Sequence, residues 1–130
     1  MQERNASPSR VAAMPSRAPL QGRSKASLER MLCTARDLMV ERGSEDFTLQ
    51  EVSSRGQVSI GSIYLRFAGK DALVRAVLVS AMHALRGAED AMLAGLLATC
   101  KSLGEFVAQY VAEYADVLDM HAPLLRLAML

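Results

Sequence analysis

The sequence has 130 residues, of which 51% are apolar, so it can bury the core of one domain. Its net charge of +1 is unevenly divided, because residues 1–75 carry 12 Lys and Arg against 8 Asp and Glu, whereas residues 76–130 carry 3 against 6. This division favours contact of the first half with a polyanion, although splits of this size also arise by chance.

Several functional classes find no support in the residue pattern. Cys33 and Cys100 belong to no CxxC pair, and His83 and His121 have no partner at metal-ligand spacing, so we assign no metal and no disulfide. No nucleophile–base pair or phosphate loop is present, which argues against an enzyme and gives no reason to expect a cofactor. No apolar run is long enough to cross a bilayer, and we predict a cytoplasmic protein.

The first part of the chain divides into an arm and a helix. Residues 1–22 are basic and contain prolines that interrupt helices, so we expect a disordered basic arm. Apolar residues then recur at helical spacing, which predicts a helix over Ser27–Arg42 that ends at Gly43.

Two short helices follow. Thr48 and Glu51 have the spacing of a capping box, which predicts a helix over Leu49–Arg55. Ser59 is the next N-cap candidate, so a third helix is expected over Ile60–Phe67. Only three or four residues separate the two helices, which is the length of the turn in a helix-turn-helix.

The second half continues the helical pattern. A longer helix is expected from about Lys70, interrupted or ended by Gly87, and a fifth helix after Ser102. Pro123 suits the first turn of a sixth helix, and Tyr110 is among the side chains that could line a pocket between helices. No segment alternates like a strand, so the predicted fold class is all-α.

The predicted third helix has a surface suited to a major groove. Ile63 and Phe67 share its core face, whereas Gly61, Ser62 and Leu65 point the opposite way. Small outward side chains allow close approach of the backbone to DNA, Leu65 can touch a thymine methyl group, and Ser62 can bond to a base edge.

Polar side chains surround this surface. Tyr64 and Arg66 flank it, and Lys70 adds a positive charge beside the free N–H groups of the next helix. Taken alone, the spacing is a weak motif, and it favours a small helical bundle in which Gly61 and Ser62 only allow close packing.

A resemblance separates these two interpretations. The run FTLQEVSSRGQVSIGSIYLRFAGKDALVRAV, preceded by ERG, resembles the DNA-binding segment of the tetracycline-repressor (TetR) family. The resemblance covers Arg23 to about Val77 and implies a homodimeric repressor of double-stranded DNA that a small-molecule effector releases. The matching features are Phe47-Thr48, Val52, Val58-Ser59, Gly61, Ile63-Tyr64, Phe67, Lys70 and Leu73.

The resemblance also assigns roles by position. It implies that Thr48, Tyr64 and Lys70 hold phosphates, and Arg66 stands where the family often has a histidine and would contact phosphate as well. Arg23 and Lys25 would follow the DNA backbone or the minor groove. The residues nearest the bases would be Ser59, Ile60 and Ser62.

The chain departs from the family in three ways. Gly56-Gln57 replaces the usual Ala-Gly of the turn, so the left-handed residue is either Gln57, with strain of about 1 kcal/mol, or Gly56, without strain. The recognition face lacks Arg, Asn and Gln, so bidentate base contacts are missing. In the family, the regulatory domain continues through several more helices than this chain contains. The resemblance therefore implies that residues 23–69 form a DNA-binding domain and that residues 70–130 form only part of a ligand-binding and dimerisation domain.

A rival interpretation gives the chain a different partner. A helical module could bind another protein through its apolar end PLLRLAML, Pro123–Leu130, and never bind DNA. The same end could instead pair two copies of the chain. The operator and the effector are not encoded in any pattern that we can read.

Overall fold

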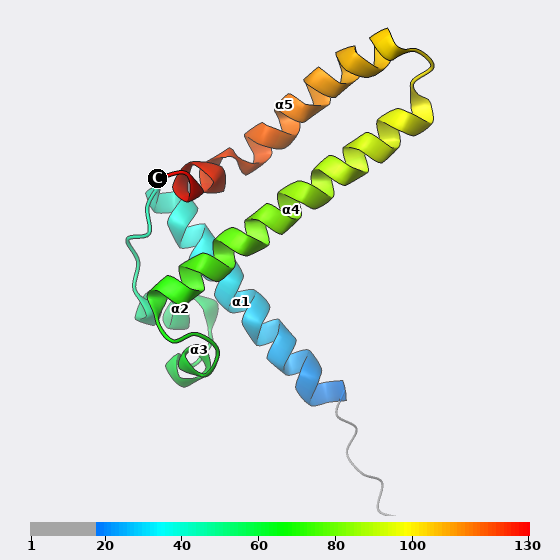
Figure 1. Ribbon diagram of the computed structural model, residues 1–130. Coiled ribbons are helices and arrows are strands. Elements are labelled where there is room, and N and C mark those ends of the chain that lie inside the picture. The colour runs from blue at the N-terminus through cyan, green and yellow to red at the C-terminus, as the bar shows by residue number, and fades with distance from the viewer. Residues whose placement is uncertain (1–17) are drawn as a thin grey trace, which may run out of the picture.

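The computed structural model describes residues 18–130, and within them every regular element is a helix (Figure 1). The all-α prediction is therefore confirmed, and no strand occurs in this part of the chain. The same residues contain no helix with the length and apolarity that a bilayer crossing requires. The helices are α1 (Ala18–Arg42), α2 (Leu49–Gly56), α3 (Ile60–Arg66), α4 (Lys70–Thr99) and α5 (Leu103–Ala128).

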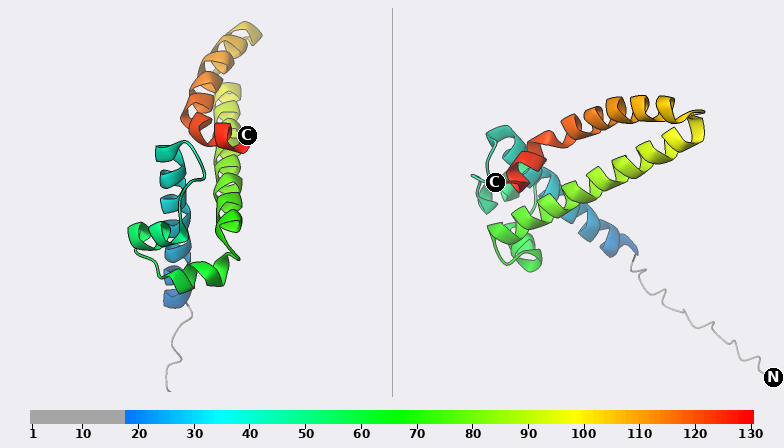
Figure 2. Two further views of the ribbon diagram at one scale, coloured as in Figure 1. Left: turned by 90° about the vertical axis from the view of Figure 1, so that its left-hand side faces the viewer. Right: turned by 45° about the horizontal axis from the view of Figure 1, so that its top comes forward.

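The helices form a head and a long hairpin. Helices α1 to α3 make the head, and α1 crosses α4 near the beginning of α4 (Figure 1). Helix α5 returns antiparallel along α4, and its last turns lie beside the Arg42 end of α1 (Figure 2). The hairpin therefore contacts the head at two places, through the first turns of α4 and the last turns of α5.

One hydrophobic core joins the three head helices to α4. Its most enclosed side chains are fully shielded from solvent and come from different helices, among them Met39, Ile63 and Leu73. Because α4 contributes side chains to this core, the direction of α4 is fixed relative to the head. The core consists of Met31, Ala35, Leu38, Met39, Phe47, Leu49, Val52, Val58, Ile63, Leu73, Val74 and Val77.

The start of α1 differs from the prediction. The helix begins at Ala18 rather than Ser27, so residues 18–22 of the expected basic arm are helical, whereas residues 1–17 of that arm lie outside the described residues. Pro19 falls in the first turn, where its missing N–H has no helical partner to lose. The following Gln, Arg, Lys and Ala residues are good helix formers, and they carry the helix past Ser27.

The two long helices pass through residues that were expected to break them. Helix α4 continues through Gly87, since one glycine costs only about 1 kcal/mol and Leu85 and Met92 are buried on either side of it. Helix α5 includes Pro123, so the predicted fifth and sixth helices are one. Figure 1 shows α5 changing direction before its last turns, as a proline that removes one helical hydrogen bond requires.

Helices α1 and α2 approach closely at Gly56. This residue is buried, and a Cβ atom placed on it would lie 2.8 Å from Thr34 Oγ1 and 3.4 Å from Thr34 Cβ. The distance of 2.8 Å is shorter than a van der Waals contact allows, so a side chain at this position would force Thr34 to shift. Glycine is therefore needed at this position because of α1, and not because of the backbone conformation of the turn.

We predict that Gly56→Ala lowers the free energy of unfolding by about 1 kcal/mol, because the new methyl group overpacks the contact with Thr34. Thr34→Ala removes Oγ1, the nearer of the two opposing atoms, so the double variant should lose less stability than the two single variants together. Denaturant unfolding of all four proteins measures this coupling. Strict additivity would show that Thr34 does not restrict position 56.

Candidate nucleic-acid interface

Helix α2 begins with the capping box that the sequence predicts. The Glu51 amide donates to Thr48 Oγ1 at 3.2 Å, and the Thr48 amide donates to Glu51 Oε2 at 2.8 Å. Phe47 and Val52, on either side of the cap, are both buried and can form the expected staple. The Thr48 hydroxyl oxygen thus serves as the acceptor for the first turn of α2, and the Thr48 residue itself is exposed.

The turn between α2 and α3 places its strain on Gln57. This residue has φ 51° and ψ 46°, in the left-handed region, whereas Gly56 is the last residue of α2. The first of the two predicted alternatives is therefore correct. The Ser53 hydroxyl donates to the Val58 carbonyl at 2.6 Å, and the Val58 amide donates to the Ser53 carbonyl at 3.1 Å. These bonds hold the turn despite a strain of about 1 kcal/mol.

Helix α3 begins at the predicted N-cap, Ser59. The Ser62 amide donates to Ser59 Oγ at 3.0 Å, and the two hydroxyl oxygens are 2.7 Å apart. The helix ends at Arg66, with Phe67 as its C-cap, one residue before the predicted end. The two hydroxyls that were expected nearest to the bases are thus hydrogen-bonded to each other.

One side of α3 faces the core, and the rest of its surface faces solvent. Ile63 is fully buried, whereas Leu65 is 89% exposed, Tyr64 58% and Ile60 39%. Exposed apolar side chains of this size are costly on a short helix unless a partner covers them. The structure therefore presents the predicted recognition surface outward.

Arg66 connects α3 to the beginning of α1. Its Nη2 atom donates to the Ser24 carbonyl at 2.7 Å and also to the Ser24 hydroxyl. Arg23 and Lys25 are the exposed neighbours of Ser24 in α1, so this contact brings the basic start of α1 next to the end of α3. The helical start of α1, which the sequence did not predict, is what makes the contact possible.

Lys70 stands at the junction of the head and α4. It is the first residue of α4, and its Nζ atom lies 5.2 Å from the centroid of the Phe47 ring. A cation over an aromatic face is held in place by the ring quadrupole. Gly69, the N-cap, provides no side-chain bond to the first amides of α4, so these amides remain available beside the ammonium group.

Two ion pairs join α1 to α2. Arg42 Nη2 lies 2.6 Å from Glu51 Oε1, and Arg55 Nη1 donates to Glu41 Oε2 at 2.7 Å. The Arg42 hydrogen bonds, followed by the Thr48 amide, lower the pKa of Glu51 from 4.5 to about 2. The hydrogen bond from Arg55 likewise lowers the pKa of Glu41. These two arginines therefore serve the structure of the head.

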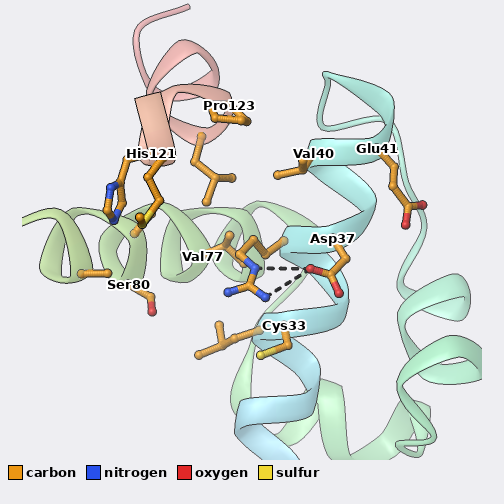
Figure 3. Close-up of a pocket in the computed structure, with 14 residues that line it drawn as sticks. Cys33, Asp37, Val40, Glu41, Val77, Ser80, His121 and Pro123 are labelled. Atoms are coloured by element: carbon orange, nitrogen blue, oxygen red, sulfur yellow. Dashed lines mark hydrogen bonds and ion pairs between the residues drawn. The ribbon is translucent and has the colours of Figure 1, made fainter. Parts of the chain in front are cut away.

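A cavity of about 590 Å³ lies between α1, α4 and α5 (Figure 3). Arg36 and Asp37, which form an ion pair at 3.2 Å, lie on its α1 wall, and His121 lies on its α5 wall. Tyr110, which could have lined a pocket, stacks instead on Tyr114 with ring centroids 5.5 Å apart. The lining residues are Leu32, Cys33, Arg36, Asp37, Val40, Glu41, Val77, Ser80, Ala81, Ala84, Met120, His121, Pro123 and Leu124.

Sequence comparison assigns the head to a known family. Residues 32–77 match the family described as bacterial regulatory proteins, tetR family. The chain carries the helix-turn-helix domain of a TetR-family regulator. Searches of the curated proteins and of the solved structures find no match.

The matched segment holds most of the predicted interface. It covers the last three turns of α1, all of α2 and α3 and the first turns of α4, and Arg23 lies before it. The match over this segment supports a DNA-binding transcriptional regulator, which is the predicted function class.

The pKa of Glu51 leads to a pH prediction for the head. Because the folded pKa is about 2 and the ordinary value is 4.5, the carboxylate stabilises the fold above pH 4.5, and this stabilisation is lost as the pH falls towards 2. We expect the urea midpoint of wild type to fall across this window, and Glu51→Gln to show a smaller fall. Glu45→Gln, in the loop before α2, is the control. Equal pH dependence in Glu51→Gln and wild type would contradict the prediction.

Proposed function

We propose that this TetR-family regulator is a repressor that binds duplex DNA with α3 in the major groove. The observation that carries the proposal is the exposure of Ile60, Tyr64 and Leu65 on a helix whose only buried side chain is Ile63. A helix of this kind fits the width of the major groove, and its apolar side chains can contact thymine methyl groups.

Contacts to the bases are expected to be weak. Ser59 and Ser62 lie at the N-terminal end of α3, where helices of this class approach the bases, but their hydroxyls discriminate poorly between base pairs. Leu65 adds contact with a methyl group only. We therefore expect DNA shape and the phosphate contacts to supply most of the affinity.

Contacts to the phosphates come from residues around α3. Thr48 is exposed at the start of α2, Tyr64 is 58% exposed, and Lys70 has an ammonium group that Phe47 positions. Arg66 uses Nη2 for Ser24 and retains other guanidinium donors for a phosphate. Arg23, which directly precedes Ser24 in α1, would add a positive charge for the DNA backbone.

The salt dependence of DNA binding tests this proposal. Lys70→Ala should lower affinity for duplex DNA and reduce the slope of log K against log salt by about 1 per bound subunit, because one phosphate contact is lost. Lys101→Ala is the matched control, because Lys101 is exposed in the loop at the far end of the hairpin. The slope for this variant should equal that of wild type. If the two variants gave equal slopes, Lys70 would not contact a phosphate. If wild type showed no salt-dependent binding to duplex DNA, the proposal would be refuted.

We further propose that a small-molecule effector binds the cavity between α1, α4 and α5. Its volume of about 590 Å³ is within the range of ligand pockets, and its walls combine apolar side chains such as Val40 and Leu124 with the Arg36–Asp37 pair. A ligand there would contact the head through α1 and the hairpin through α4 and α5. It could therefore favour a different angle between them and release the DNA.

Blocking the cavity tests the effector proposal. Compounds found to dissociate the protein from duplex DNA should lose this effect on Ala84→Phe, which places a ring in the cavity. Ala91→Phe carries the same substitution two turns further along α4, outside the lining, and should respond like wild type. Fluorescence anisotropy of labelled DNA measures both. An effector that acts equally on all three proteins binds elsewhere.

A further inference from the structure

The cavity between α1, α4 and α5 has walls that are mostly apolar. Val40 lies on its α1 wall and Val77 on its α4 wall, and Leu124 adds apolar surface from α5 (Figure 3). Contact with an apolar ligand would remove these side chains from water, which is favourable in proportion to the area covered. The cavity therefore selects first for the apolar character of its ligand.

The acidic and basic side chains on the walls already have partners of opposite charge. Arg36 Nε and Nη2 donate to Asp37 Oδ1 at 3.3 and 3.2 Å. Glu41 uses both of its carboxylate oxygens for the guanidinium group of Arg55, which belongs to α2 and lies outside the cavity. A charged ligand would therefore meet no uncompensated charge among these lining residues, which all belong to the described part of the chain. Burial of the ligand's own charge would then cost free energy.

His121 gives the cavity a directional hydrogen-bond acceptor. Its Nδ1 atom lies 2.8 Å from the Val117 carbonyl oxygen of the same helix. Because a carbonyl oxygen only accepts, Nδ1 carries the hydrogen, and the neutral ring keeps a lone pair on Nε2. Within residues 18–130, Nε2 forms no hydrogen bond. Figure 3 shows the ring pointing from α5 towards α4 and away from its own helix, so Nε2 can accept a hydrogen bond from a ligand.

We propose that the ligand of this cavity is an uncharged, mostly apolar molecule with a hydroxyl group, such as a phenol or a lipophilic alcohol, whose O–H donates to His121 Nε2. This assignment of a ligand class rests on the proposed function, in which the cavity receives the effector. The apolar walls supply most of the affinity, the compensated ion pairs remove any strong preference for an anion or a cation, and His121 fixes the orientation of the ligand.

Four naphthalene probes with a substituent at the same ring position test the ligand class. Naphthol carries a hydroxyl group, its methyl ether lacks the donor, naphthoate is an anion and naphthylmethylammonium is a cation. Their intrinsic fluorescence reports binding to the full chain at neutral pH without DNA. We expect naphthol to bind about fivefold more tightly than its ether, because of one hydrogen bond, and at least about tenfold more tightly than either ion.

Two pairs of variants locate the bound probe and its hydrogen bond. Ala84→Phe should weaken the binding of naphthol, whereas Ala91→Phe, outside the lining, should bind it like wild type. His121→Phe keeps a ring but has no Nε2, so naphthol and its ether should bind to it equally. His83→Phe, at an exposed position of α4 outside the lining, is the matched control and should keep the preference for naphthol. Both affinities are compared within each variant, so a general change in the cavity cancels, and circular dichroism checks folding.

The outcomes distinguish the ligand class from the effector role. The ligand class would be overturned if either ion bound as tightly as naphthol, if Ala84→Phe left naphthol binding unchanged, or if the preference for naphthol survived in His121→Phe. The anisotropy of labelled duplex DNA is then measured with each probe. If naphthol binds with the expected selectivity but releases no DNA, the ligand class is upheld and the effector role is contradicted. If an ion releases the DNA and Ala84→Phe abolishes this effect, the effector role is upheld and the ligand class is overturned.

Discussion

A helix of seven residues is not stable by itself in water, and α3 therefore depends on the burial of Ile63 in a core made by other helices. Ser59 satisfies its first amides, and the Ser53–Val58 bonds fix the turn that leads into it. One buried side chain is enough to hold the helix because α1, α2 and α4 already define the site that receives it. The exposed side chains of Ile60, Tyr64 and Leu65 are consequently free to serve an outside partner.

The position of α3 in turn depends on helices that extend well beyond the head. Helix α4 contributes Leu73 and Val77 to the core of the head, and further along its length it buries Leu96 within the hairpin. One helix therefore belongs to both the head and the hairpin. Leu124, near the end of α5, packs against the same core. A movement of α5 relative to α1 would therefore reach the DNA-binding surface through packed side chains. The cavity lies at this junction, which is why a ligand there has a physical route to the head.

The sequence predicts those features that are encoded within a few residues of one another. The capping box of Thr48, the N-cap at Ser59 and the helix start at Lys70 all appear as expected, and so does the outward surface of α3. The features that it misses depend on distant contacts. Arg66 bonds to Ser24, 42 residues away, and Gly87 remains helical because its neighbours are buried. The cavity exists only once α4 and α5 are placed beside α1.

The chemistry of α3 also constrains how such a protein can recognise DNA. Its exposed surface offers methyl contacts and two hydroxyls that are already paired, so each half-site contributes little discrimination. Specificity then has to come from a property that a single head does not possess. A homodimer, which the resemblance to the TetR family implies, would fix the separation of two heads, and this separation would select half-sites at one spacing. A weak reader of bases thus gains selectivity from geometry, since a duplex with the wrong spacing can engage only one head.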